Sequence, residues 1–121
     1  MKRNRPHRPE RLAALVQETL AGAIATDLKD PRIGFVTVTG VTVTADGAHA
    51  TVRISVLGPE EDKARALAGL NSARGYLRTH LAQTLPLRTA PELRFELDRG
   101  LEHAQRIDRI LAEIKRDEAD S

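Results

Sequence analysis

The stretch from residue 34 to residue 56 constrains the fold most, because its pattern is typical of a β-hairpin. The segment "GFVTVTGVTVT" alternates valine with threonine, and the turn signal Asp46-Gly47 follows it. The returning segment has apolar side chains at every second position, so one face of that strand can be buried. These inward residues are Ala50, Val52, Ile54 and Val56. A chain built on this hairpin needs helices to cover the apolar face.

The alternation in the first strand contains a slip. Val36 and Val38 occupy even positions, whereas Val41 and Val43 occupy odd positions. In a regular strand the two pairs would point to opposite faces of the sheet. Gly40 lies where the parity changes, so we predict a β-bulge there.

Helical periodicity precedes and follows the hairpin. Before it, Pro31 predicts the end of a helix whose apolar residues recur at helical spacing. This first stripe consists of Leu12, Leu15, Val16, Leu20, Ile24 and Leu28. After it, helical sequence runs from "GPEED" to about Leu85, and "ELRFELDR" predicts a third strand with Leu93, Phe95 and Leu97 facing inward. With a last helix from near Leu101, the order predicts a small α+β domain with helices on one face of a three-stranded sheet.

Gly75 interrupts the second helical region, where glycine costs about 1 kcal/mol relative to alanine. Leu70 and Leu77 would share one face of a continuous helix, with Arg74 at the centre of that face. Burying its guanidinium without a partner would be very costly. We therefore predict a break at Gly75 that releases Arg74 to solvent. The glycine is then either a simple helix cap or a bend, bare of side chains, that faces a phosphate backbone.

The charges are segregated, although the net charge of the 121-residue chain is only +2. Residues 1–11 hold five basic side chains and one acidic one, and no acidic residue occurs between Asp62 and Glu92. Such blocks shape the local field more than the net charge does. For Lys63 and Arg65 we prefer the interpretation of ordinary solvated charges. The candidate residues for binding a phosphate backbone are Lys2, Arg3, Arg5, Arg74, Arg78 and Arg88.

The sequence carries no recognisable catalytic constellation. Its four histidines are scattered and form no close metal-ligand pair, and no phosphate-binding loop or serine-nucleophile motif occurs. We expect no catalytic residues, no metal site, no cofactor and no small-molecule substrate. The chain has no cysteine and no apolar stretch long enough to span a bilayer. We expect a cytoplasmic monomer without membrane contact.

Several segments together resemble the bacterial ribosome-binding factor A family. They follow the family's order from roughly Arg11 to Ile114, as "DPRIGFVTVTGV", "AHATVRISVLG", "LNSARGYLR" and "PELRFELDRGLEHAQRIDRIL". The resemblance implies a type II KH-like fold. In this family an Ala-X-Gly kink, matched by Ala73, Arg74 and Gly75, replaces the GXXG loop of ordinary KH domains. The resemblance also implies binding to the free small ribosomal subunit through its 16S rRNA, a role in late maturation and rRNA processing, and cold adaptation.

We expect three regions, namely a flexible basic arm at 1–8, the KH-like domain at 9–100, and a C-terminal helix with an acidic tail at 101–121. Three aromatic residues are too few for a base-stacking platform, so we expect contact mainly through RNA phosphates and shape. Two other functions stay open, an enzyme with an unrecognised site and a protein-binding adaptor. The adaptor would use a stripe on the C-terminal helix, although packing of this stripe on the domain's own core is the simpler interpretation. The stripe consists of Ile107, Ile110, Leu111 and Ile114.

Overall fold

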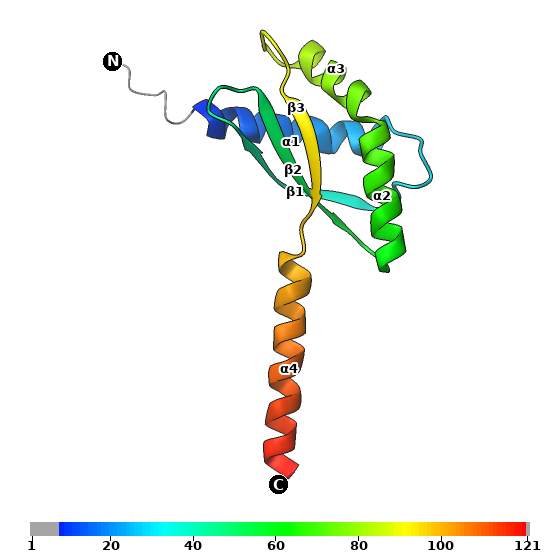
Figure 1. The fold of residues 1–121 in the computed structure, drawn as a ribbon, viewed down its shortest axis with the longest axis vertical. Helices are drawn as coiled ribbons and strands as arrows, with labels where there is room; N and C mark the ends of the chain where they lie inside the picture. The colour runs from blue at the N-terminus through cyan, green and yellow to red at the C-terminus, as the bar shows by residue number, and fades with distance from the viewer. Residues whose placement is uncertain (1–7, 121) are drawn as a thin grey trace, which may run out of the picture.

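The computed structural model describes the backbone of residues 8–120 and the side chains of residues 9–100 and 108–117. Within these residues it confirms the predicted α+β order and the KH-like arrangement with a kinked helix pair (Figure 1). The basic arm lies outside the described residues except for Arg8, where the first helix begins. The elements are α1 (Arg8–Thr26), β1 (Val36–Val43), β2 (His49–Val56), α2 (Glu60–Ser72), α3 (Arg74–Thr84), β3 (Glu92–Leu97) and α4 (Gly100–Asp120).

The sheet has the strand order β1-β2-β3. Strands β1 and β2 form the predicted antiparallel hairpin, and Gly47 occupies its turn with a φ of 74°. The Asp46 carboxylate stabilises this turn by accepting hydrogen bonds from the Thr44 hydroxyl and the Ala48 N–H. Strand β3 runs parallel to β2, which requires a crossover, and α2 and α3 provide it.

The predicted β-bulge is present in β1. Val38 pairs with Ile54, but the next paired residue of β1 is Gly40, opposite Arg53. The extra residue restores the alternation, so the valines on both sides of the bulge can face the core. The Arg53 side chain lies over Gly40, where a Cβ would be 2.8 Å from its Nη2. A side chain at position 40 would therefore displace this arginine.

The hydrophobic core lies between the sheet and the helices α1, α2 and α3, which pack on one face of the sheet (Figure 1). Fully buried residues come from all of these elements. They include Val16, Leu20, Val52, Ile54, Ala66, Leu70, Leu77 and Leu81. The prediction that the first stripe forms the buried face of one helix is only partly correct. Leu15 is 47% exposed, and Leu28 lies beyond the end of α1 at Thr26.

Helix α4 leaves the end of β3 and extends away from the rest of the molecule (Figure 1). It continues through the predicted acidic tail as far as Asp120. Ile110, Leu111 and Ile114 are each about half-exposed, so the interpretation that they pack on the domain's own core is wrong. The side chain of Ile107 lies outside the described residues. None of the helices in the described chain is long and apolar enough to cross a membrane.

Candidate nucleic-acid interface

The kink between α2 and α3 is formed by a single residue, Ala73, with φ −87° and ψ 1°. Its N–H donates to the carbonyls of Gly69 and Leu70, and its own carbonyl accepts from the N–H of Leu77 at 2.9 Å. The predicted break at Gly75 is wrong by two residues, since Gly75 lies in the first turn of α3. The helix-cap interpretation is also wrong. Ala73 makes the break without glycine, because its backbone angles are open to other residues.

The kink resolves the conflict that the sequence indicated at Arg74. Leu70 and Leu77, on the two sides of the break, are both fully buried. Arg74 is exposed, as predicted. Its guanidinium forms no hydrogen bond or ion pair with any other residue that the structure describes. Its guanidinium is therefore available to an anionic partner.

Gly75 lies beside Arg74 in open space. A Cβ built on it would meet no atom within 4 Å, and its φ is not positive. Neither packing nor backbone conformation within the described chain requires glycine at this position. A glycine there nonetheless weakens the first turn of α3 relative to alanine. The bare, exposed backbone is consistent with close approach by a partner.

Arg78 is held by the domain itself. Its side chain is half-buried, and Nε and Nη2 donate to the Ala90 carbonyl at 3.1 and 3.0 Å. These two bonds fasten the segment before β3 to α3. Because an arginine fork has five N–H donors, the Nη1 group can still bind an anion.

The structure brings three of the candidate arginines together through two hollows that share Arg78. The first, of about 270 Å³, is lined by Arg74, Gly75 and Arg78, with Glu92 and Leu93. The second, of about 460 Å³, adds Arg88, which is exposed, and His49. We call Arg74, Gly75, Arg78 and Arg88 the kink surface.

The kink surface differs from the sequence-based expectation in three ways. Glu92 lines both hollows and Asp46 lines the second, so two carboxylates come from outside the acid-free window, although Arg74 and Arg78 form no ion pair with either. His49 was missed, because nothing in the sequence connects a lone histidine after a turn with α3. Lys2, Arg3 and Arg5 lie outside the described residues.

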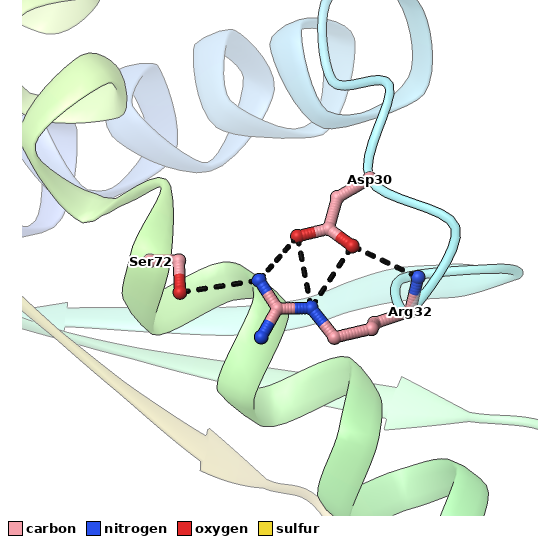
Figure 2. Close-up of polar contacts among 3 residues, drawn as sticks. All are labelled: Asp30, Arg32 and Ser72. Carbon is pink, nitrogen blue, oxygen red and sulfur yellow. Dashed lines mark hydrogen bonds and ion pairs between the residues drawn. The ribbon is translucent and has the colours of Figure 1, made fainter.

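An ion pair between Asp30 and Arg32 lies in the segment before β1, and a hydrogen bond from Arg32 connects it to the end of α2 (Figure 2). Asp30 accepts from the backbone N–H of Arg32 and from its Nε, each at 3.0 Å. Arg32 also reaches Ser72, the last residue of α2, with Nη2 3.2 Å from the hydroxyl oxygen (Figure 2). Hydrogen bonding to Arg32 lowers the pKa of Asp30 to about 2.

A second polar group lies where α1 and α3 meet. The Tyr76 hydroxyl donates to the Asp27 carboxylate at 2.7 Å, and its ring stacks on His80 with centroids 6.2 Å apart. The hydrogen bond raises the pKa of Tyr76 and lowers the pKa of Asp27. These contacts fix the aromatic side chain that follows Gly75.

Lys63 and Arg65 have different surroundings. Arg65 is exposed, as expected for a solvated charge. Lys63 is only 8% exposed, with Nζ 3.4 Å from Glu60, so the solvated interpretation is wrong for it. Lysine can bury its aliphatic stem while its ammonium reaches a carboxylate. Bidentate hydrogen bonds from Arg99 lower the pKa of Glu60 to about 2.

The described residues offer no evident metal centre. No three histidine, aspartate or glutamate side chains among them lie close enough to hold a metal ion. The free charge at the kink is cationic, and its neighbourhood contains half-buried and exposed arginines. What this arrangement can do chemically is bind anions such as RNA phosphates.

The sequence profile of the family described as "Ribosome-binding factor A" matches residues 8–111. This chain belongs to the ribosome-binding factor A family. A family protein from Desulforamulus reducens is 47% identical over 113 residues, which cover 93% of this chain and 94% of that protein. One from Geobacter metallireducens is 45% identical over 92% of this chain and 94% of its own length.

Solved structures of the family have the same fold. The crystal structure of ribosome-binding factor A from Thermus thermophilus aligns with a TM-score of 0.68 at 32% identity, covering 76% of this chain and 97% of that one. A second set of coordinates for the Thermus thermophilus protein, a homology model, was fitted into a cryo-EM map of a 30S complex. It aligns with a TM-score of 0.60 at 32% identity, covering 71% of this chain and 90% of that one.

Proposed function

We propose that this protein binds the free small ribosomal subunit through its 16S rRNA and assists the late maturation of that subunit. The observation that carries this proposal is the Thermus thermophilus relative, whose coordinates were fitted into a map of a 30S complex. This chain is similar to that relative over most of its length and belongs to the same family. The proposal extends that relative's association with the 30S subunit to this chain.

The kink surface is the proposed RNA contact. Arg74 has a free guanidinium, and Gly75 leaves the adjacent backbone open. Phosphates would contact Arg74, Arg78 and Arg88, and the basic arm would add Lys2, Arg3 and Arg5. Such contacts recognise the position and shape of folded RNA more than its sequence.

The proposed role is assembly without chemistry. The protein would act in the cytoplasm as a monomer, hold an unfinished 16S rRNA conformation, and let other enzymes complete rRNA processing. Stable RNA misfolds persist longer in the cold, so the need for such a factor would rise at low temperature. The absence of any recognisable catalytic motif in the sequence is in keeping with this role.

Sedimentation tests the proposal directly. The purified protein is mixed with free small subunits, with large subunits or with intact ribosomes, and each mixture is centrifuged through a sucrose cushion. We expect co-sedimentation with free small subunits, and its loss as salt rises. Equal recovery with large subunits, or no recovery with any particle, would contradict the proposal.

A second candidate function is a protein-binding adaptor that acts through α4. The exposed Ile110, Leu111 and Ile114 favour it, since half-exposed apolar side chains along one helix can enter a partner's groove. Replacing the three by serine separates the candidates. The adaptor would lose its partner, whereas phosphate binding at the kink surface would keep its salt dependence.

A further inference from the structure

Two large apolar side chains lie exposed at the end of the β-hairpin opposite its turn. Strand pairing ends with Val36 opposite Val56, so the next residues outward are Phe35 and Leu57. Phe35 is 86% exposed and Leu57 is 84% exposed. Leaving such a side chain in water forgoes the favourable free energy of burying it. Both residues line a hollow of about 240 Å³, which we call the Phe35 hollow.

The backbone that carries these side chains is held in place. Gly34 and Gly58 flank the pair with φ values of 55° and 127°, conformations that other residues rarely adopt. Ile33 is buried against Gly69 of α2, where a Cβ would be 2.8 Å from Ile33 Cγ1. Arg32 is fixed by Asp30 and Ser72 (Figure 2). The exposed aromatic ring is thus presented by an ordered segment.

The charged side chains around the Phe35 hollow are Arg32, Asp62 and Arg65. Arg32 is already paired with Asp30, so Arg65 is the cation at the hollow that can bind an anion. Arg65 is exposed, and its guanidinium forms no hydrogen bond or ion pair with another described residue. The site therefore offers a flat apolar surface beside a free cation. A ligand that fits it needs a flat face and a negative charge.

We propose that the Phe35 hollow binds one unpaired nucleotide of RNA, with the base stacked on Phe35 and its phosphate paired with Arg65. This inference rests on the proposed function and adds to it a base contact distinct from the kink surface. Sequence-selective RNA recognition uses unpaired bases of this kind, stacked on aromatic side chains. The nucleotide combines the flat face and the negative charge that the site calls for.

The geometry connects the hollow with the kink surface. Arg65 and Ser72 are seven residues apart on α2, so they share one helix face about 10 Å apart. Arg32 lies between them, because it lines the hollow and also bonds Ser72. Ser72 directly precedes Ala73 at the kink. The hollow and the kink surface share no lining residue, so the nucleotide contact would be a second site, connected to the kink through α2.

A protein partner is the competing occupant, and the size of the site argues against it. Stable protein interfaces bury about 1,200–2,000 Å² in total. The Phe35 hollow has two exposed apolar side chains. The residues around them are mostly charged or belong to the turn at residues 31–34. A single base covers such a surface, whereas a protein partner would leave it incompletely buried.

A tryptophan reporter distinguishes the two occupants. The chain contains no tryptophan, so Phe35→Trp introduces a single fluorophore that can also stack on a base. We expect its emission to be quenched when free small subunits, or a short single-stranded oligoadenylate, are added. Leu15→Trp, on the half-exposed part of α1, is the matched control and should not change. Unchanged emission, or a blue shift without quenching, would overturn the proposal, the latter in favour of a protein contact.

Affinity measurements give a second, independent test. We expect Phe35→Ala to weaken binding to small subunits by about 5- to 150-fold, because a stacked base contributes about 1–3 kcal/mol. It should leave the slope of log affinity against log salt unchanged, whereas Arg65→Ala should lower that slope by about 0.7–0.9. Leu15→Ala is the control for loss of an exposed apolar side chain.

The outcomes separate this inference from the proposed function. If the unsubstituted protein does not sediment with small subunits, the proposed function fails first. If it does, and Phe35→Ala binds equally well, the nucleotide site alone is refuted. Circular dichroism confirms the fold of each variant, and Phe35→Tyr should retain most of the affinity because it keeps an aromatic face.

Discussion

Gly75 is the residue at which stability and function separate most clearly. The structure leaves open space around it, so Gly75→Ala should raise the free energy of unfolding by about 0.5–1 kcal/mol through helix propensity. The same substitution should weaken binding to small subunits, because a methyl group would obstruct a close RNA backbone, and Gly75→Leu should weaken it further. Urea unfolding and a sedimentation titration measure the two effects.

The matched control for this substitution is Gly22→Ala. Gly22 also lies in a helix, and a Cβ there would likewise meet no atom within 4 Å. It should gain similar stability and retain full binding. Equal affinities for the Gly22 and Gly75 variants would remove the kink from the proposed interface.

Asp30 gives a prediction about pH. Its pKa is lowered to about 2 in the folded protein, from an ordinary value of 3.8, by hydrogen bonding to Arg32. Within that range the unfolded chain binds more protons than the folded one, so stability falls as the pH falls. The contribution of Asp30 should be fully present above about pH 4 and be lost as the pH drops through about 2.

Asp30→Asn tests this contribution. Urea unfolding from pH 5 downward should show the unsubstituted protein more stable than the variant at pH 5, with the difference in the free energy of unfolding shrinking towards pH 2. Because the pair is exposed to solvent, the effect is small at high salt. If the difference in the free energy of unfolding stayed constant between pH 5 and pH 2, the Asp30–Arg32 pair would not be its cause.

At the scale of elements, α3 contains two arginines with different tasks. Arg78 donates two hydrogen bonds to the Ala90 carbonyl and fastens the segment before β3. Arg78→Ala should therefore lower the free energy of unfolding by about 1.5–3 kcal/mol, as for hydrogen bonds made by a charged group. Arg74→Ala, at an exposed position without partners, should change it by less than about 0.5 kcal/mol.

The salt dependence of binding compares the same two arginines for their part in RNA binding. Arg74→Ala should lower the slope of log affinity against log salt by about 0.7–0.9, the share of one phosphate contact. Arg78→Lys, which keeps the charge, should preserve the slope even if it weakens the hydrogen bonding to the Ala90 carbonyl. An unchanged slope in the Arg74 variant would place the RNA contact on another element.

The elements themselves were largely predictable from the sequence. The parity slip located the bulge at Gly40, because a strand's two-residue period makes any extra residue visible. The buried guanidinium that a continuous helix would require predicted the break near Arg74. Its position two residues earlier, at Ala73, did not follow from the helical spacing, since many residues can adopt those backbone angles, although the Ala-X-Gly resemblance included Ala73.

The parts that sequence reasoning missed depend on contacts between distant segments. Lys63 was expected in solvent, but α2 packs so that its side chain is buried. Phe35 would be placed in the core by composition alone, since phenylalanine is usually buried. Phe35 is exposed because strand pairing ends at Val36 and because Gly34 turns the backbone just before it. The alternation of residues along the strand does not indicate where the pairing ends. Likewise, only the fold brings His49 beside Arg78 and Arg88.

At the scale of the whole molecule, we expect α4 to be separable from the domain that carries the kink surface. All core residues among the described side chains lie between Leu12 and Leu97, and α4 extends away from them (Figure 1). Removing residues 101–121 should therefore leave the melting temperature of the domain within a few degrees, with Arg99 still bound to Glu60. Thermal unfolding followed by circular dichroism measures this, and loss of cooperative unfolding would contradict it.

The truncated protein also tests how binding is divided over the molecule. Every arginine and lysine that we assign to RNA phosphates precedes residue 101, so the slope of log affinity against log salt should equal that of the full chain. Any loss of affinity should then be independent of salt and reproduced by Ile110→Ser with Ile114→Ser in the full chain, because both side chains are apolar and half-exposed. A lower slope in the truncated protein would instead mean that α4 carries phosphate contacts of its own, through cations such as Arg109 and Arg116.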